Sequence, residues 1–187
     1  PALQRRRAVE DMERRKDREA WLNISREVQR RFRASQMPQI AGYEAATWWF
    51  PNEAVGGDYC DVIPLTKGHT AFCIADVCGH GLGPSLLMAS VRASIRTLLL
   101  RETSPQVLLE SLGRALADDF QNGAFVTMVL AMLASQTHQV QFANAGHATA
   151  MLYRSAAQSF IQLDSTGLPV GLIAPPDCPS GPILPWQ

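Results

Sequence analysis

Two aspartates stand beside glycines at the ends of neighbouring apolar segments, and this arrangement restricts the fold more than any other feature of the chain. Asp58 follows a pair of glycines and opens a short apolar stretch, and Asp76 closes the strand-like segment 70–77. If these stretches pair as a hairpin across 64–70, both carboxylates lie at one end of a sheet, where they repel one another and are poorly hydrated. A divalent cation that prefers oxygen ligands, Mg²⁺ or Mn²⁺, resolves this conflict. The alternative is that each aspartate merely caps a turn.

The order of the predicted elements indicates an α+β or layered α/β fold. Strand-like segments come first, two helices follow, and short strands separated by polar turns come last. Alternating βαβ units would give a different order, and no internal repeat is evident. Ser104 is expected to be the N-cap of the second helix and Pro105 its first residue. The predicted strands are 43–50, 70–77, 124–133, 139–146, 149–154 and 159–163, and the predicted helices are 83–102 and 104–120.

Residues 2–35 are predicted to form one long helix, because they contain neither glycine nor proline. The later apolar residues recur every three or four positions and form one stripe: Trp21, Ile24, Val28 and Phe32. The residue before a proline avoids the α conformation, so the helix should end near Met37–Pro38. A narrow apolar stripe on a charged helix needs a partner. We therefore expect 1–37 to be a linker or coiled-coil helix that forms a homodimer or packs on the domain formed by 38–187.

The formal net charge is zero, but the charges are unevenly distributed. Residues 1–36 contain eleven Lys and Arg against six Asp and Glu, and the remainder contains six against eleven. A basic arm beside an acidic body can indicate nucleic-acid binding. In this arm, however, acids are interspersed among the bases, which is typical of a solvated helix. We expect no nucleic-acid partner.

Composition predicts a globular cytoplasmic protein. Apolar residues make up 47% of the chain and charged residues 18%, and no apolar run reaches the roughly 18 residues that a membrane helix needs. The arginine-rich N-terminus lacks the apolar segment of a secretory signal, so we expect no membrane association. The four cysteines show no C-x-x-C spacing and are expected to be isolated thiols in a reducing cytosol: Cys60, Cys73, Cys78 and Cys178.

Five motifs occur in order along the chain: VGGDYCDV, IADVCGHGLGPSLLMA, FVTMVLAML, FANAGHATAMLY and STGLPVGL. Together they resemble the bacterial metal-dependent (PPM, type 2C-like) serine/threonine protein phosphatases of the stage-II-sporulation-E/RsbU type. The resemblance covers about residues 40–173. It implies a layered α-β-β-α sandwich, and the long N-terminal helix resembles the linker that joins such domains to a sensor or receiver module.

The resemblance also implies a reaction and its metal ligands. The aspartate after Gly-Gly and the aspartate opening the D-x-x-G-x-G segment bind metal in that family, which corresponds to Asp58 and Asp76 here. The backbone carbonyl of Val77 would be a further ligand, and the complete site would hold two Mn²⁺ or Mg²⁺ ions. These ions would activate a water that attacks the phosphorus of a phosphoserine or phosphothreonine. No covalent enzyme intermediate is required.

Several other residues are expected beside this site without binding metal. Asp61 is interpreted as structural or as supporting the ligands, and His80 as adjacent to the site. His147 could act as a general acid, but the resemblance favours a structural role with Asn144. Glycines near the acids let backbone carbonyls and waters approach an ion without a Cβ in the way. The site-adjacent set is Gly57, Asp61, Gly79, His80, Gly81, Asn144 and His147.

The chain departs from the family pattern after its G-L-P-x-G-L segment. That pattern continues with a T-D-G segment whose aspartate binds metal, whereas only Asp164 and Asp177 remain here, in contexts that do not match. We therefore expect this chain to supply about half of the metal ligands, to lack the closing strands of the fold and to be inactive or nearly so by itself.

The implied function is that of a partner-switching signalling phosphatase. Its substrate would be a phosphoprotein such as an anti-sigma-factor antagonist, and an upstream sensor or receiver domain would regulate it as an output domain. Two alternatives remain open at this stage. The chain could be a non-catalytic module with a phosphatase fold, or its glycine-rich turn at 79–83 could be the phosphate-binding loop of a histidine-kinase-type ATPase.

Overall fold

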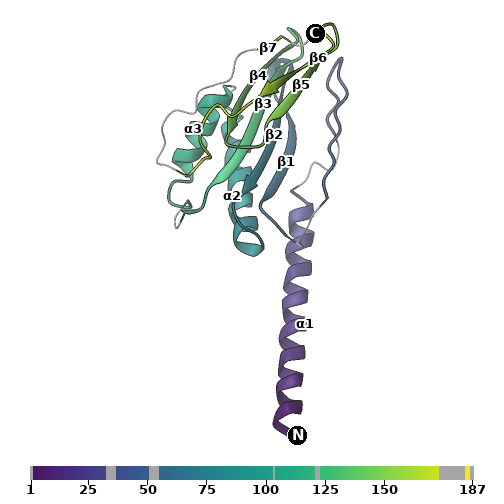
Figure 1. The fold of residues 1–187 in the computed structure, drawn as a ribbon, viewed down its shortest axis with the longest axis vertical. Helices are drawn as coiled ribbons and strands as arrows, with labels where there is room; N and C mark the ends of the chain where they lie inside the picture. The colour runs from purple at the N-terminus through teal and green to yellow at the C-terminus, as the bar shows by residue number, and fades with distance from the viewer. Residues whose placement is uncertain are drawn as a thin grey trace.

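The computed structural model describes residues 2–32, 37–50, 55–102, 104–120, 123–172 and 184–185. A long helix leads into a sheet covered by two further helices (Figure 1). The helices are α1 (Ala2–Arg30), α2 (Leu82–Leu98) and α3 (Pro105–Ala115), with a short 3₁₀ turn at Thr66–Gly68. The strands are β1 (Asp58–Pro64), β2 (His69–Val77), β3 (Val126–Ala134), β4 (Gln139–Ala145), β5 (Ala150–Arg154), β6 (Ser159–Leu163) and β7 (Leu184–Pro185).

The strands form two antiparallel sheets. The larger has the order β1-β2-β3-β4-β7, and the smaller is the hairpin β5-β6. Short turns join β1 to β2, β3 to β4 and β5 to β6, whereas α2 and α3 lie between β2 and β3. The register of the first hairpin pairs Asp58 with Asp76 and Pro64 with Thr70, so the hairpin predicted from the sequence is confirmed.

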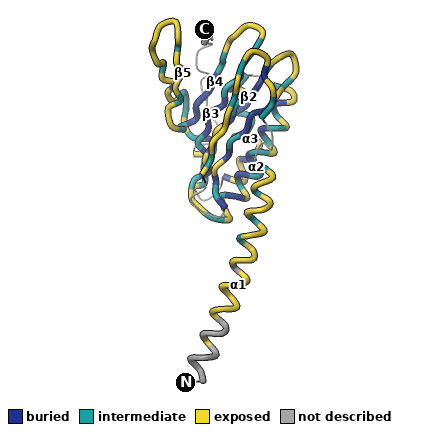
Figure 2. Tube along the Cα trace, turned by 90° about the vertical axis from the view of Figure 1, so that its right-hand side faces the viewer, coloured by how far each residue is buried: buried dark blue, intermediate teal, exposed yellow. Residues whose placement is uncertain are grey.

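The main core lies between the large sheet and the helices α2 and α3. Alternate residues of β2 face the helices and are buried, as the two-residue period of a strand requires. Figure 2 shows buried segments concentrated in the sheet and the two helices, whereas α1 is mostly exposed. The helical residues that meet the sheet include Met88, Val91, Ile95, Leu108 and Leu112.

The opposite face of the large sheet meets the small hairpin. Ala131 and Phe142 of the large sheet pack with Leu152 and Leu163 of β5 and β6. The described residues thus form one helical layer, a five-stranded sheet and a two-stranded sheet. The second helical layer implied by the resemblance is not among them.

The helix α1 extends away from the rest of the molecule along its longest axis (Figure 1). Of the predicted apolar stripe, Trp21, Ile24 and Val28 are exposed, by 69%, 56% and 46%, and Phe32 alone packs against the main core. None of the described helices is long and apolar enough to cross a membrane.

Two sequence-based boundaries need correction. The helix α1 ends at Arg30, before the expected end near Met37–Pro38, because the amides of Arg31 and Phe32 bond to carbonyls three residues back and tighten the last turn. The predicted strand 43–50 is not a strand: apart from an isolated bridge between Ile40 and Tyr43, this segment joins no ladder with the other described residues. Strand-like composition cannot supply the hydrogen-bonding neighbour that a strand needs.

Candidate functional site

The two aspartates predicted to share a site lie directly opposite one another. Asp58 is the first residue of β1 and pairs with Asp76, next to the end of β2. Both side chains are exposed, and partial shielding from water raises the pKa of Asp76. The charge of Asp58 raises this pKa further, His147 lowers it, and a hydrogen bond to Asp58 again raises it. The sheet therefore brings the two carboxylates close enough to interact electrostatically.

Gly57 allows β1 to approach the end of β2 closely. A Cβ atom built on Gly57 would lie 2.4 Å from the carbonyl oxygen of Val77 and 3.0 Å from the Cβ of Val77. The Gly57 carbonyl also accepts a hydrogen bond of 3.2 Å from the Val77 amide. Only glycine fits at this contact. The glycine before Asp58 thus holds the Val77 backbone, a predicted ligand, close to the acid pair.

Replacing Gly57 by Ala should lower the free energy of unfolding by about 1–3 kcal/mol, the usual cost of forcing extra atoms into a packed contact. The Val77 carbonyl must move to make room for the new methyl group. Gly56→Ala is a matched control, because no described atom lies within 4 Å of a Cβ built on Gly56. Thermal unfolding of both variants tests this, and equal midpoints would contradict the close contact.

The turn after β2 carries three residues predicted to border the site. Gly79 and Gly81 have φ angles of 92° and 84°. With ψ at −152°, Gly81 occupies a region open essentially to glycine alone, and it is the N-cap of α2. His80 stands exposed between them. These glycines let the chain turn sharply from Val77 into α2, and this need for positive φ angles explains why both positions carry glycine.

Asn144 lies near the end of β4, and His147 follows two residues after that strand. Asn144 is fully buried; its Oδ1 accepts a bond of 2.9 Å from the His147 amide, and its Nδ2 donates one of 3.3 Å to the Leu163 carbonyl. A hydrogen bond of 2.8 Å joins His147 Nδ1 to the hydroxyl of Thr127, the residue paired with Asp76 on β3. Burial lowers the pKa of His147, and the charges of Asp76 and Asp58 raise it. Asn144 thus holds the backbone of a histidine that interacts electrostatically with both aspartates.

Asp61 lies apart from the acid pair, on the face of β1 that is covered by helices. It is 1% exposed and receives bonds from Arg96 of α2, at 2.8 Å from Nε and 3.1 Å from Nη2. The Tyr59 hydroxyl donates a third bond of 2.7 Å, and burial raises the pKa of that hydroxyl, which keeps its proton in place. Asp61 therefore fastens α2 to β1 and does not face the predicted metal.

Three residues that contribute here were not selected from the sequence: Tyr59, Arg96 and Thr127. A threonine within the apolar run of β3 is a weak polar signal that could have drawn attention to Thr127. Arg96 has no such signal, because many exposed helix positions carry arginine. Its role depends on a partner 35 positions away.

The donor atoms fit part of a metal site. Two carboxylates and a nearby backbone carbonyl are hard oxygen donors of the kind that Mg²⁺ and Mn²⁺ prefer. A bound cation would also offset the partial burial and the repulsion by Asp58 that together raise the pKa of Asp76. No group of three or more His, Cys, Asp or Glu side chains within the described ranges could hold a metal ion. Among the described residues, the carboxylates of Asp58 and Asp76 are therefore the two side chains predicted to bind metal.

Comparison with known proteins gives the family. Residues 66–183 match the sequence pattern of the family described as stage II sporulation protein E, SpoIIE, over more than half of the chain. The chain belongs to this family. Asp76 and Val77 lie inside the matched region, whereas Asp58 precedes it, so Asp58 is connected with the site by its pairing with Asp76.

Individual relatives agree with membership of the SpoIIE family. The chain is 26% identical over 151 residues to phosphoserine phosphatase RsbU of Bacillus subtilis, covering 81% of this chain and 45% of RsbU. The SiaA-PP2C domain of Pseudomonas aeruginosa has a similar fold, with a TM-score of 0.72 and 18% identity over 92% of this chain and 69% of that one. The PP2C phosphatase domain of Bacillus subtilis SpoIIE gives a TM-score of 0.60 at 16% identity, over 71% and 39% of the two chains.

SpoIIE-family membership and these folds confirm the mixed α+β architecture with its N-terminal helix. They also assign the glycine-rich turn at 79–83 to a phosphatase-type fold, and not to a histidine-kinase-type ATPase. The chain spans about half or less of the length of the curated relatives that it matches.

Proposed function

We propose that the chain is the catalytic part of a metal-dependent phosphoprotein phosphatase that hydrolyses phosphoserine or phosphothreonine. The observation that carries this proposal is the direct pairing of Asp58 with Asp76 at the end of the first hairpin. Membership of the SpoIIE family supports the proposal, as does the similarity to a relative named a phosphoserine phosphatase. The natural substrate would be a phosphoprotein of a partner-switching signalling system.

The proposed metal ligands are the carboxylates of Asp58 and Asp76 and the backbone carbonyl of Val77, with Mn²⁺ or Mg²⁺ as the metal. When bound, such ions supply positive charge that lowers the pKa of a coordinated water and neutralises charge on phosphoryl oxygens. Gly57 sets the distance between β1 and Val77, and Asn144 sets the position of His147. We assign His147 a positioning role beside the two aspartates, in line with the resemblance, since Asn144 holds its backbone and Thr127 bonds to its Nδ1.

The test is hydrolysis of a phosphoserine peptide by the full-length protein with Mn²⁺. Activity should disappear with a chelator and return when Mn²⁺ is added back. A phosphotyrosine peptide serves as the comparison substrate. Activity that survives complete metal removal would refute the proposal.

A second candidate is a non-catalytic signalling module with the same fold. The observation that favours it is the absence of a third side-chain ligand among the described residues. If the full-length protein neither binds Mn²⁺ nor hydrolyses either peptide, this candidate is the better description.

Three free thiols at Cys60, Cys73 and Cys78 fit a reducing compartment, and we propose the cytoplasm as the location.

We further propose that α1 pairs with a second copy or with an upstream regulatory segment through Trp21, Ile24 and Val28. These residues are exposed and share one helical face, and an isolated helix gains little stability from propensity alone. Ile24→Ser should convert a dimer into a monomer in light scattering. Arg30→Ser, on an exposed position of the same helix, should leave the mass unchanged. If the unmodified chain is already monomeric at high concentration, the homodimer is excluded.

A further inference from the structure

The last turn of α1 is hydrogen-bonded to the segment that leads into Asp58. The Gln29 side chain donates from Nε2 to the carbonyl of Gly56 at 2.6 Å. Its Oε1 accepts from the amide of the same glycine at 3.3 Å. One carboxamide therefore satisfies both backbone groups of a residue that is 27 positions away in the sequence and two positions before Asp58.

The end of α1 is itself fixed to α2. The Arg92 side chain donates from Nε to the carbonyl of Phe32 at 3.1 Å, and its guanidinium lies 5.2 Å from the centre of the Phe32 ring. Phe32 also packs against the main core. Gln29 thus extends from an anchored helix end, and the bonds that it makes can hold Gly56 in place.

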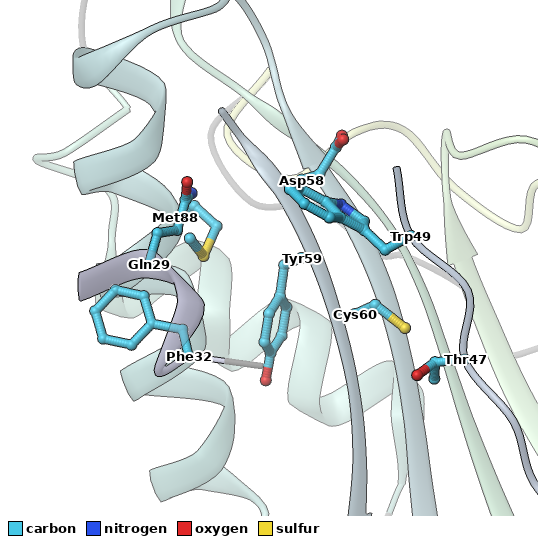
Figure 3. Close-up of a pocket in the computed structure, with 8 residues that line it drawn as sticks. All are labelled: Gln29, Phe32, Thr47, Trp49, Asp58, Tyr59, Cys60 and Met88. Atoms are coloured by element: carbon cyan, nitrogen blue, oxygen red, sulfur yellow. The ribbon is translucent and has the colours of Figure 1, made fainter. Parts of the chain in front are cut away.

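Gly56 has open space on the side where a Cβ atom would lie. Among the described residues, no atom lies within 4 Å of a Cβ built on it. A cavity of about 250 Å³ adjoins this region, lined by Gln29, Phe32, Trp49, Asp58 and Met88 among others (Figure 3). Figure 3 shows Gln29 coming from α1 and Asp58 from β1, and Phe32 belongs to the turn that follows α1. With open space on this side, the two hydrogen bonds from Gln29 are well placed to fix the position of Gly56.

We propose that Gln29 is a positioning residue for the metal site, an inference that rests on the proposed function. Its carboxamide fixes Gly56, the next residue bonds to the Val77 amide, and Asp58 follows directly. The two bonds of Gln29 therefore hold the chain two residues before Asp58, the residue that pairs with Asp76. In this way the end of α1 becomes part of the support for the acid pair.

Hydrogen exchange of single amides in the metal-free chain tests the positioning. Gln29→Ala keeps a good helix former and removes both bonds to Gly56. We expect the amides of Gly56 and Val77 to exchange at least about 10-fold faster, because the loosened segment no longer holds Gly57 against Val77. Glu27→Ala, exposed on the same helix, should change neither amide. If only the Gly56 amide responds, Gln29 merely covers that residue and the proposal is wrong.

Calorimetric titration of the full-length protein with Mn²⁺ gives the second measurement. Gln29→Ala should weaken Mn²⁺ binding by about 10-fold, since residues that support ligands typically contribute 10- to 100-fold to metal affinity. Its thermal midpoint should match that of Glu27→Ala, which separates positioning from general stability. Unchanged affinity with intact binding in the parent would overturn the role of Gln29 and leave the proposed function standing. If the parent binds no Mn²⁺, the proposed metal centre is wrong, and the exchange experiment still decides whether Gln29 positions Asp58.

Discussion

Replacing Asp76 by Asn is expected to reduce Mn²⁺-dependent hydrolysis of a phosphoserine peptide by at least about 100-fold, more than the loss typical of residues that only support ligands. The substitution removes a charged donor while preserving the size of the side chain. It also removes one of two carboxylates that repel each other without metal, since the charge of Asp58 raises the pKa of Asp76. The metal-free protein should therefore keep or increase its thermal stability.

Steady-state kinetics with and without Mn²⁺, together with thermal unfolding after chelation, test this prediction. Asp118→Asn is the matched control, because Asp118 is exposed and lies outside the candidate site. The expected result is a large loss of turnover with a normal unfolding curve for Asp76→Asn alone. Full activity in that variant would remove Asp76 from the set of ligands.

Replacing Arg96 by Leu should lower the free energy of unfolding by about 3–5 kcal/mol, the cost of leaving a buried charge without its partner. The Asp61 side chain is 0% exposed, whereas that of Arg96 is 40% exposed. Removing the arginine leaves a buried carboxylate that, among the described residues, still accepts a hydrogen bond from the Tyr59 hydroxyl. For a chain of this size the midpoint should fall by about 6–20 °C.

Two further variants make this prediction specific. Arg101→Leu, at an exposed position beyond α2, should have nearly the same free energy of unfolding as the parent. The double variant Asp61→Leu with Arg96→Leu should recover much of the loss, since an apolar pair can replace a buried ion pair at little cost. A small effect of Arg96→Leu, or a double variant no more stable than the single one, would show that the ion pair does not hold α2 on β1.

The sequence predicts the features that depend on neighbouring residues. The hairpin that brings Asp58 and Asp76 together follows from two apolar runs separated by a short polar turn. The start of α3 was also predicted, with Ser104 as N-cap and Pro105 as first residue, although the Ser104 side chain makes no capping hydrogen bond. The apolar period of a strand or helix and the residue preferences of turns and caps are local properties, so they can be read from a single sequence.

Features that depend on distant contacts were missed or misplaced. The segment 43–50 has the composition of a strand but pairs with no described strand. The bonds from Gln29 to Gly56 and from Arg96 to Asp61 join residues 27 and 35 positions apart, and neither pair has a spacing or motif that marks it. Three predicted features lie outside the described residues: the helical residues 33–36, Asp177 and Cys178. The assignment of Asp58, Asp76 and Val77 as metal ligands stays a prediction.

Anomalous X-ray scattering at the manganese edge, from crystals of the full-length protein grown with Mn²⁺, tests the central claim most directly. We predict a manganese peak in contact with the carboxylates of Asp58 and Asp76, with ligand distances of about 2.1 Å, as hard divalent cations show with oxygen donors. The Val77 carbonyl should lie within reach of the same ion. A manganese peak bound by neither aspartate, in a protein that hydrolyses phosphoserine, would contradict the proposed site.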